Sequence, residues 1–530
     1  MKSWATAAAM LAVALLTYFQ FPGHTWLQQD SQIYVPILEH LRDPMVLRND
    51  ILVAQAPVAF TIYDEAARFL RGLTGLEFRE VLGVEQIAAR ALGVWGLYLM
   101  ASAMGLGPWP ALMAAAICSL GAKIAGPEVL TFEYEPTPRA IALPLVICAV
   151  GLAAHRRYWA AEVAGAVALL YHPPTAFPFW VVFLVVLWVA KRARGLAMLA
   201  AAAAILAIAA SAQAGGTDPR PLQEFFRRVT PLQEQLQRMR TAYVWISTWP
   251  PRLLVHHLIL AAVVGAAFAR VRRELPRDLA IFLLGLPLVG LAAMPLSWLL
   301  LEKAKWAMVP QVQPLRGLLF VALWMQFLTA VNGILAVQRR RLWESIGWFA
   351  LAYVLPLHTV VTMPLAWRTA ALVLALAALA VLVARFDWRM APAGALAAFF
   401  AIPLVGDVVN YPQLHTPELA QLSSWARSSA PQDAVFLFPD AGRALFPGIF
   451  RAEARRAVYV DWKGGGQVNY LRDFGEQWWF RWQLTMAGGF HPADVAKYSG
   501  LGITYVVLQS PGVERAPVFE NAKYAVYSLR

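Results

Sequence analysis

The sequence predicts an α-helical multi-pass membrane protein with about 13 transmembrane helices and a small α/β domain at its C-terminal end. Of its 530 residues, 59% are hydrophobic and only 15% are charged, whereas soluble domains are about 45–50% apolar. The apolar residues form repeated, almost uncharged runs that are long enough to cross a membrane as helices. From about residue 410 the composition changes to that of a soluble domain.

The expected spans are the long apolar runs, taken in chain order. They cover residues 4–21, 86–104, 108–125, 139–153, 159–171, 176–190, 196–212, 252–269, 279–300, 315–337, 345–362, 369–384 and 391–409. No small-residue cleavage site follows the first run, so we interpret it as a retained span and not as a signal peptide.

Clusters of basic residues between the spans predict the orientation. The clusters are His155-Arg156-Arg157, Lys191-Arg192-Arg194, Arg270-Arg272-Arg273, Arg339-Arg340-Arg341 and Arg385/Arg389. Because cytoplasmic loops carry an excess of Lys and Arg, we expect a cytoplasmic N-terminus and an extracytoplasmic (periplasmic) C-terminal domain. The same clusters account for the net charge of +13, so we expect no nucleic-acid partner. Cys118 and Cys148 lie in apolar runs, which excludes a disulfide framework or a structural zinc site.

The predicted organisation is a transmembrane domain over residues 1–409 and a soluble domain over residues 410–530. Residues 22–85 form a long first outside loop, whose stretch 54–73 is half-amphipathic and indicates helices lying in the membrane interface. In the soluble domain, Thr416 and Pro417 start a helix. Short β-rich runs then alternate with helical stretches, as is typical of an α/β domain.

The stretch WLQQDSQIYV places Asp30 and Tyr34 just after the first span, on one face of a short helix near the membrane surface. At such a half-dry interface we expect the pKa of Asp30 to be raised toward that of a general base. The alternative is that Asp30 only caps the helix.

The stretch TFEYEPTPRA contains Glu133 and Glu135, which point the same way if the segment is extended. Together they predict a site for a divalent cation such as Mg²⁺ or Mn²⁺. The alternative is an acidic loop paired with Arg139 at the membrane boundary.

Two further outside loops carry candidate anion-binding residues. His172 ends a span and is held by two prolines, although a lone interfacial histidine is often structural. The later segment LEKAKWAMVPQVQPLRG places cations on the outer face, against the positive-inside bias, which predicts phosphate binding with Arg316 foremost. Snorkelling to lipid headgroups is the alternative. The candidates in this segment are Lys303, Lys305, Gln313 and Arg316.

In the soluble domain, Asp461 and Trp462 follow a strand and precede the glycine cluster 463–466. Together with Lys463, which opens that cluster, they suit a sugar, whose C–H face stacks on an indole, and loop residues after strands are common binding residues. Docking of this domain onto the membrane part is the alternative, and the residues alone do not separate the two.

The whole layout resembles the GT-C class of integral-membrane glycosyltransferases. DSQIY resembles the acidic element that opens their first outside loop, and Glu133-x-Glu135 stands where the oligosaccharyltransferase branch has its second acidic motif. More closely, four patterns look like an uncharacterised bacterial family of this class. They are LxDPxxLxND (41–50), HP (172–173), QPLR (313–316) and DAVFLFP…RRAVYVDWK (433–463).

The resemblance implies an enzyme of the bacterial cytoplasmic (inner) membrane, in contact with membrane lipids. It would transfer a sugar from a polyprenyl-phosphate-linked donor to a glycan, lipid or protein acceptor on the outer face, by an inverting single displacement. Asp30 would be the base with Asp50 as the second candidate, Arg316 would stabilise the departing phosphate, and Glu133 and Glu135 would hold a cation or orient the acceptor.

The sequence departs from the GT-C pattern at two places, and two other functions are alternatives to this transfer. No WWD motif is present, because Phe480 follows Trp478-Trp479, and Ser31 replaces the second acid after the first span. A lipid-linked polysaccharide polymerase or ligase would use an outside Arg/His pair and no carboxylate base. A lipid or polysaccharide transporter would place ionisable residues within the spans, which are nearly uncharged here.

Overall fold

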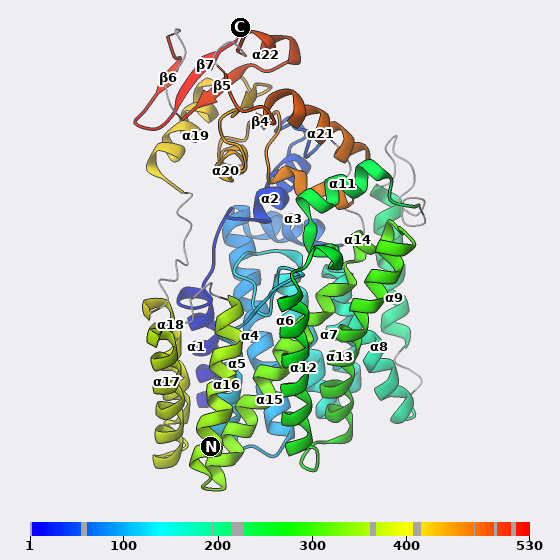
Figure 1. Cartoon of the computed structure of the whole chain (residues 1–530), viewed down its shortest axis with the longest axis vertical. Coiled ribbons are helices and arrows are strands. Elements are labelled where there is room, and N and C mark those ends of the chain that lie inside the picture. Colours follow the sequence, from blue (N-terminus) through cyan, green and yellow to red (C-terminus); the bar gives the residue numbers. More distant parts are fainter. Residues whose placement is uncertain are drawn as a thin grey trace.

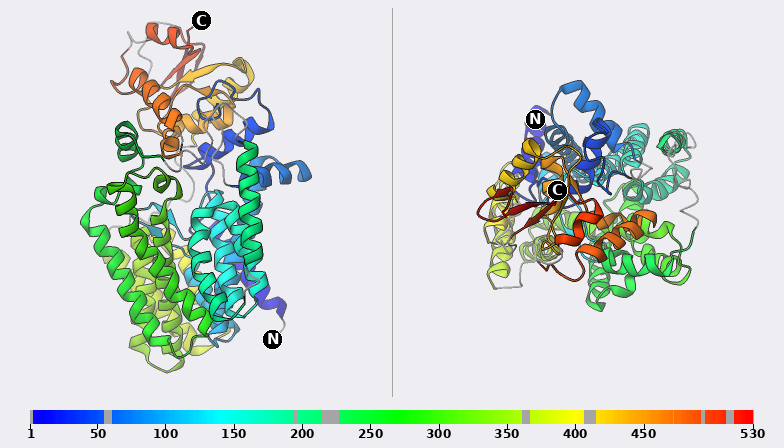
Figure 2. Two further views of the ribbon diagram at one scale, coloured as in Figure 1. Left: turned by 90° about the vertical axis from the view of Figure 1, so that its right-hand side faces the viewer. Right: turned by 90° about the horizontal axis from the view of Figure 1, so that it is seen from above.

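The computed structural model describes residues 3–54, 61–192, 196–213, 227–360, 367–405, 415–470, 472–491, 495–509 and 516–529. The molecule has two layers along its long axis, a bundle of long helices and a smaller mixed layer of helices and strands (Figure 1). We call the described part of 415–529 the cap. The N-terminal and C-terminal ends lie at opposite ends of the molecule, and the cap covers one end of the bundle in both side views (Figures 1 and 2).

Apolar helices build the bundle, and each predicted span overlaps one of them. They are α1 (Ser3–Phe19), α4 (Phe78–Ala103), α5 (Pro108–Cys118), α6 (Pro138–Ala154), α7 (Tyr158–Tyr171), α8 (Pro173–Val189), α9 (Leu196–Gln213), α12 (Pro251–Val271), α13 (Arg277–Ser297), α15 (Leu319–Gln338), α16 (Leu342–Val360), α17 (Trp367–Phe386) and α18 (Ala391–Val405).

Four helical stretches in the described part of the chain are long and apolar enough to cross a membrane. They are Pro251–Val271, Arg277–Lys303, Met308–Gln338 and Trp367–Phe386. Most of the other bundle helices are apolar but shorter. The mostly helical, multi-pass architecture is confirmed, while the full span count stays a prediction.

Close helix contacts hold the bundle together where glycines remove side chains. α4 and α6 meet at Gly96, where an added Cβ would lie 2.5 Å from the backbone nitrogen of Cys148. Gly151 completes the contact, because its Cβ would lie 2.6 Å from the carbonyl oxygen of Gly96. Small residues at such crossings let membrane helices pack backbone to backbone. α15 is buried along its whole apolar window and forms the centre of the bundle.

Between the bundle and the cap lie short elements from the outside loops (Figure 1). They are α2 (Ser31–Arg42), α3 (Tyr63–Thr74), the antiparallel pair β1 (Lys123–Ile124) and β2 (Val129–Leu130), α11 (Pro231–Arg240) and α14 (Met308–Val312). A π-helical turn, Trp298–Lys303, extends α13, and a 3₁₀ turn, Pro314–Leu318, precedes α15.

The cap is a small α/β unit, as predicted. Its elements are α19 (Pro417–Ser429), β3 (Val435–Leu437), α20 (Phe446–Ala454), β4 (Ala457–Val458), the 3₁₀ turn Gly464–Asn469, α21 (Arg472–Thr485), α22 (Val495–Tyr498), β5 (Tyr505–Leu508), β6 (Phe519–Glu520) and β7 (Ala525–Ser528). The sheet order is β4-β3-β5-β7-β6. β3 is parallel to β4 and β5, whereas β7 is antiparallel to β5 and β6.

Thr416 caps α19 as predicted, because its hydroxyl accepts a hydrogen bond from the Leu419 amide at 3.3 Å. The predicted domain boundary between residues 409 and 410 lies outside the described residues and stays a prediction.

The loop that follows α1 and the cap share one hydrophobic core. Ile33 and Ile51 from the loop pack in the same cluster as Phe450 and Val458 from the cap. Ion pairs surround this core, including Arg455 with Glu39 at 2.8 Å. The loop therefore links the cap to the bundle and holds the two in a fixed relative position.

Candidate functional site

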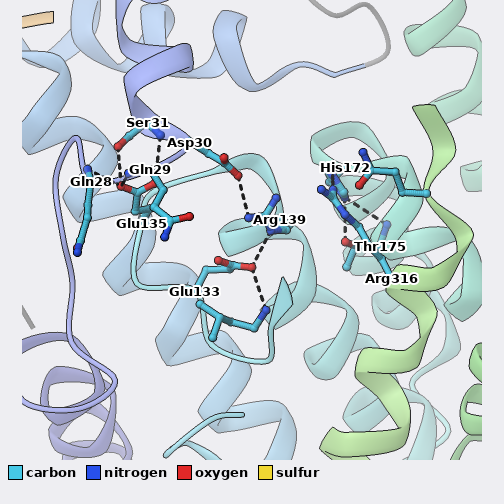
Figure 3. Close-up of polar contacts among 12 residues, drawn as sticks. Gln28, Gln29, Asp30, Ser31, Glu133, Glu135, Arg139, His172, Thr175 and Arg316 are labelled. Atoms are coloured by element: carbon cyan, nitrogen blue, oxygen red, sulfur yellow. Dashed lines mark hydrogen bonds and ion pairs between the residues drawn. The ribbon is translucent and has the colours of Figure 1, made fainter. Parts of the chain in front are cut away.

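Asp30 lies at the start of α2, where the first outside loop meets the cap. It occupies the N-cap position, but its side chain makes no capping hydrogen bond. Its two oxygens instead accept from Arg139 Nη2 at 3.0 Å and from Lys463 Nζ at 2.7 Å, and 29% of the side chain is exposed. The pair with Arg139 is drawn in Figure 3. The capping interpretation is therefore wrong, and Asp30 is a half-exposed carboxylate held between two cations.

The expected rise in the pKa of Asp30 is also wrong. Burial by itself would raise it, but the charges of Lys463 and Arg139 and their hydrogen bonds outweigh burial and hold the pKa of Asp30 well below its ordinary value. Asp30 is thus ionised at neutral pH. It is also a weak base as long as both cations remain on it, because basicity falls with pKa.

Arg139 joins Asp30 to the acidic loop that precedes α6. Its Nε donates to Glu133 Oε1 at 2.6 Å, while its Nη2 holds Asp30. The Glu133 carboxylate also accepts from the Leu130 amide at 3.3 Å. For Glu133, the interpretation as an acidic loop paired with Arg139 is confirmed.

Glu135 fixes the chain that leads into α2. Its carboxylate accepts from the amides of Gln28 at 2.8 Å, Gln29 at 2.6 Å and Ser31 at 3.1 Å, and from the Ser31 hydroxyl at 2.9 Å (Figure 3). Burial, together with the charge of Asp30, raises the pKa of Glu135. This carboxylate therefore holds the backbone on either side of Asp30.

Glu133 and Glu135 do not fit a shared Mg²⁺ or Mn²⁺ ion. The Glu133 carboxylate is paired with a guanidinium, and both oxygens of Glu135 accept hydrogen bonds from other groups. Among the described residues, no three side chains of the His, Cys, Asp and Glu types gather as a metal-binding group. The arrangement does not support the predicted cation site.

Arg316 and His172 meet on the other side of Arg139 (Figure 3). Arg316 Nη1 lies 3.2 Å from His172 Nε2, and Arg316 is only 8% exposed. Burial and the nearby charges of Arg316 and Arg139 lower the pKa of His172 well below its ordinary value. His172 Nδ1 accepts from the Thr175 amide at 3.2 Å and lies 2.8 Å from the Thr175 hydroxyl, so the ring is anchored through Nδ1 and faces Arg316 through Nε2.

Arg316 is a buried cation without a negative partner. No carboxylate of the described residues lies within ion-pair distance, and its Nε has no hydrogen-bond partner there. An isolated buried charge is costly unless it is paired. A side chain this enclosed is also unsuited to snorkelling. The geometry therefore favours the interpretation that Arg316 receives an anionic ligand.

A small pocket lies beside Arg316, and we call it the Arg316 pocket. Its volume is about 10 Å³, which is room for about one water molecule. Ser297 Oγ, Gln313 Oε1 and Arg316 Nε are buried polar atoms in its lining that have no partner among the described residues. Such atoms are rare in folded proteins and indicate that a ligand or water completes them. The lining comprises Pro127, Tyr243, Val244, Ser297, Val309, Gln313, Pro314, Leu315 and Arg316.

Three tyrosines enclose the space between Asp30 and the Arg316 pocket. Burial raises the pKa of Tyr34 and Tyr243, and raises that of Tyr470 to about 12. Each of them also responds to the charges of Asp30, Arg139 and Arg316. The Tyr470 hydroxyl accepts from Gln313 Nε2 at 3.0 Å, which ties the cap to the pocket.

The structure thus gathers several of the predicted site residues and adds others. Tyr34, Arg139, His172, Gln313 and Arg316 lie around Asp30 and the Arg316 pocket. Sequence reasoning missed Tyr243 and Tyr470 as site residues. It named Lys463, with Asp461 and Trp462, as suited to a sugar, whereas the structure places the Lys463 ammonium on Asp30.

Lys303 and Lys305 do not join this site. Lys305 pairs with Glu234 at 2.7 Å, and Lys303 is exposed with its ammonium 4.8 Å from the Trp298 ring centre. The reason is local: Lys303 ends the π-helical turn, and the backbone reverses two residues later, at Lys305, with φ 55°. Neither contacts Arg316, so the prediction that they bind the same phosphate is not supported.

Asp50 is not the second base. It is 0% exposed and pairs with Arg451 at 2.7 Å, and Arg451 also holds Asp461. Arg451 and Asp461 are equally enclosed, at 0% and 2% exposed. The expectations that Asp50 takes a proton from substrate and that Asp461 contacts a sugar are wrong, because the three form a buried ionic triad between loop and cap.

Trp462 is half-buried, and its ring contacts two guanidinium groups. The carbons of the Arg240 and Arg443 guanidinium groups lie 3.8 and 4.6 Å from its centre. Its ring centre also lies 5.2 Å from that of Trp482. These contacts favour a role in joining cap and loops, and sugar stacking on Trp462 stays a prediction.

This chain matches one family model and is similar to several solved structures. A family model described as Domain of unknown function (DUF6798) matches residues 417–484. A comparison with curated proteins finds no match.

Among solved structures, ArnT from Cupriavidus metallidurans in the apo state is similar with a TM-score of 0.49 and 13% identity, over 99% of this chain and 97% of that chain. The arabinofuranosyltransferase AftD from Mycobacteria gives 0.43 and 17%, over 96% of this chain but 37% of its own length. The Archaeoglobus fulgidus oligosaccharyltransferase, tethered with an acceptor peptide, gives 0.37 and 12%, over 96% of this chain and 69% of that chain. All three are GT-C glycosyltransferases, the class that the sequence resembles.

Proposed function

We propose that this protein is an inverting glycosyltransferase that uses a polyprenyl-phosphate-linked sugar as donor. The observation that carries the proposal is Arg316, a buried cation with no carboxylate partner among the described residues, on a pocket with unsatisfied polar atoms. An ionised carboxylate, Asp30, lies across Arg139 from it (Figure 3). A cation for a leaving phosphate and a carboxylate for an acceptor proton are the two groups that this transfer requires.

The phosphate of the donor would lie against Arg316. The guanidinium still has an unbonded Nε and can bind two phosphate oxygens side by side. The Ser297 hydroxyl supplies a further donor for a phosphate oxygen, and His172, uncharged, lies against Arg316 without competing for the anion. As the sugar–phosphate bond breaks, charge develops on the phosphate oxygen, where a fixed guanidinium stabilises it more than in water.

Asp30 suits the acceptor. The acceptor hydroxyl oxygen attacks the anomeric carbon while the bond from that carbon to the phosphate oxygen breaks, and Asp30 takes the hydroxyl proton. A single displacement of this kind inverts the anomeric configuration. Arg139 keeps Asp30 ionised and separates it from the phosphate side, and Glu135 fixes the backbone around it.

The proposed location is the outer face of the bacterial cytoplasmic membrane. The site lies between the bundle and the cap, at the end of the molecule away from the N-terminus (Figure 1). The basic loops at 155–157 and 339–341 lie in the sequence on the other side of the spans, as expected for a cytoplasmic face. The acceptor would be a glycan, lipid or protein that reaches the site from the outside.

The test is sugar transfer by the purified full-length chain in lipid nanodiscs. Polyprenyl-phosphate sugars are offered with a cell-envelope glycan fraction, and the product linkage is read by NMR. Arg316→Ala and Asp30→Asn should each lower kcat/KM at least about 100-fold, as expected for loss of a charged transition-state contact. Lys123→Met is the control, because Lys123 forms an exposed ion pair with Glu128 outside the site. Transfer by Arg316→Ala at the wild-type rate, or retained anomeric configuration, contradicts the proposal.

The direct contact of Arg316 with His172 favours a second candidate, a lipid-linked polysaccharide polymerase or ligase that needs no carboxylate base. Two variants distinguish the two candidate functions. If Asp30→Asn keeps activity while His172→Ala loses it, the second candidate replaces the first. Loss of activity in Asp30→Asn supports the first.

A further inference from the structure

Lys463 reaches Asp30 from a loop whose backbone is closely packed. The first two glycines that follow it leave no room for side chains: a Cβ on Gly464 would lie 2.7 Å from Asp461 Oδ1, and one on Gly465 would lie 2.5 Å from the Trp478 ring. The Gly464 amide donates to Asp461 Oδ2 at 3.1 Å. The glycine cluster therefore serves close packing of the backbone that carries Lys463.

The buried ionic triad of Asp50, Arg451 and Asp461 also fixes this loop. Asp461, two residues before Lys463, is held by Arg451, which is held in turn by Asp50. The Asp461 carbonyl accepts from Trp478 Nε1 at 2.9 Å. With its backbone fixed in this way, Lys463 can change partners only through its flexible four-carbon side chain.

The two cations on Asp30 differ in how firmly they are held. Arg139 bonds a second carboxylate, Glu133, at 2.6 Å, so it is fixed at both ends. For Lys463, Asp30 is the one carboxylate partner among the described residues. Lysine is also the more mobile type, being a point charge without the planar fork of arginine. Lys463 is therefore the cation that an incoming anion can draw away.

The segment that starts at Lys463 also reaches the Arg316 pocket. It runs through the 3₁₀ turn Gly464–Asn469 to Tyr470, which bonds Gln313 of the pocket at 3.0 Å. One short piece of the cap thus touches the proposed base at one end and the proposed phosphate site at the other.

We propose that Lys463 is a positioning residue that moves its ammonium group from Asp30 to the donor phosphate when the donor binds. This inference rests on the proposed function of the site. In the resting protein Lys463 neutralises Asp30. After the move, one charge-assisted hydrogen bond is added to the phosphate, and Asp30, held by Arg139 alone, becomes a stronger base. The base is then strengthened only when a donor is present.

A double-mutant cycle on ligand binding tests this move without requiring catalysis. The ligand is a polyprenyl phosphate, with the same polyprenol lacking phosphate as the blank, and the full-length chain is held in nanodiscs. The variants are Lys463→Met, Asp30→Asn and both together, with Lys123→Met as the control lysine from an exposed pair. Lys463→Arg, which keeps the charge, checks that any loss comes from charge and not from misfolding.

Lys463→Met should weaken binding about tenfold, the size of one lost charge-assisted bond, and Lys463→Arg should weaken it less. Asp30→Asn should tighten binding about fivefold, because Lys463 no longer has to leave a carboxylate. In the Lys463→Met background the same Asp30→Asn change should tighten it less than about twofold. Equal tightening in both backgrounds, or wild-type affinity in Lys463→Met, would overturn the proposal.

Catalysis supplies a second, independent readout. In the wild type the acid limb of kcat, which reports the donor-bound enzyme, should lie at higher pH than that of kcat/KM. In Lys463→Met the acid limbs of kcat and kcat/KM should coincide. Acid limbs that remain at different pH in this variant would contradict the proposed movement of Lys463. A wild-type chain that passes the binding cycle but transfers no sugar refutes the proposed function and leaves the role of Lys463 standing. A wild-type chain that does not bind polyprenyl phosphate refutes both.

Discussion

The buried triad of Asp50, Arg451 and Asp461 allows a sharp prediction about stability. Replacing Arg451 by Met removes one cation from between two carboxylates that are 0% and 2% exposed. Breaking a buried ion pair on one side costs about 3–5 kcal/mol, because the remaining charge is left buried and unpaired. Here two carboxylates lose their partner, so we expect the cost to be at the upper end of that range.

A small domain loses about 4–8 °C of its unfolding midpoint for each kcal/mol. Arg451→Met should therefore lower the midpoint of the cap by more than about 10 °C. The assay is thermal unfolding of the full-length chain, followed by tryptophan fluorescence, since Trp462, Trp478 and Trp482 lie together in the cap.

Two further variants make the reasoning refutable. The triple change Asp50→Asn, Arg451→Met and Asp461→Asn removes all three charges and should recover most of the loss, because neutral amides are cheaper to bury than unpaired carboxylates. Arg48→Met breaks an exposed pair with Asp433 (3.4 Å; 45% and 41% exposed), and its midpoint should stay near that of the wild type. A loss below about 1 kcal/mol in Arg451→Met, or a triple variant less stable than the single one, would refute the argument.

The other predictions concern the site and its loop. Arg316→Lys should keep part of the activity that Arg316→Ala loses, since a lysine binds phosphate as a point charge without the paired bonds of the fork, and steady-state transfer measures this. Because the folded-state pKa of Asp30 is lowered, its ion pairs stabilise the protein above the ordinary pKa of about 4 and that stabilisation is lost as the pH falls below it. The unfolding midpoints of the wild type and of Asp30→Asn should thus differ at pH 7 and converge in acid. The ordinary pKa of an aspartate is about 4, so a difference that stays constant down to pH 3 would contradict the lowered pKa of Asp30. Gly465→Ala should lower the free energy of unfolding of the cap by about 1–3 kcal/mol, because the added Cβ would lie 2.5 Å from the Trp478 ring. Gly500→Ala is the control, because no atom lies within 4 Å of the added Cβ, and its midpoint in the same thermal assay should equal that of the wild type.

The helical bundle and the small sheet were predictable because each depends on local patterns. Long apolar runs specify membrane helices, and short β-rich runs after turns specify strands, as β3 and β5 show. The charge of loops also predicted which segments share a face. Asp30, Arg139 and Arg316 converge as expected, since all follow or precede spans on that side.

What the sequence did not reveal depends on contacts across long separations. The pairing of Lys463 with Asp30 and of Arg451 with Asp50 follows from how the cap docks, which no local pattern encodes. The sign of the pKa shift of Asp30 was wrong for the same reason, because burial was foreseen but the two cations were not. Glu133 shows the converse, since its local partner Arg139 was named correctly.

The triad also has a consequence for biogenesis. Asp50 and Arg451 are 401 positions apart in the chain, with most of the bundle helices between them. During synthesis Asp50 is made early and lacks this partner until Arg451 has been made. The pair that joins loop and cap therefore forms only after most of the bundle helices exist, and a chain that stops before Arg451 would leave the Asp50 carboxylate without its cation.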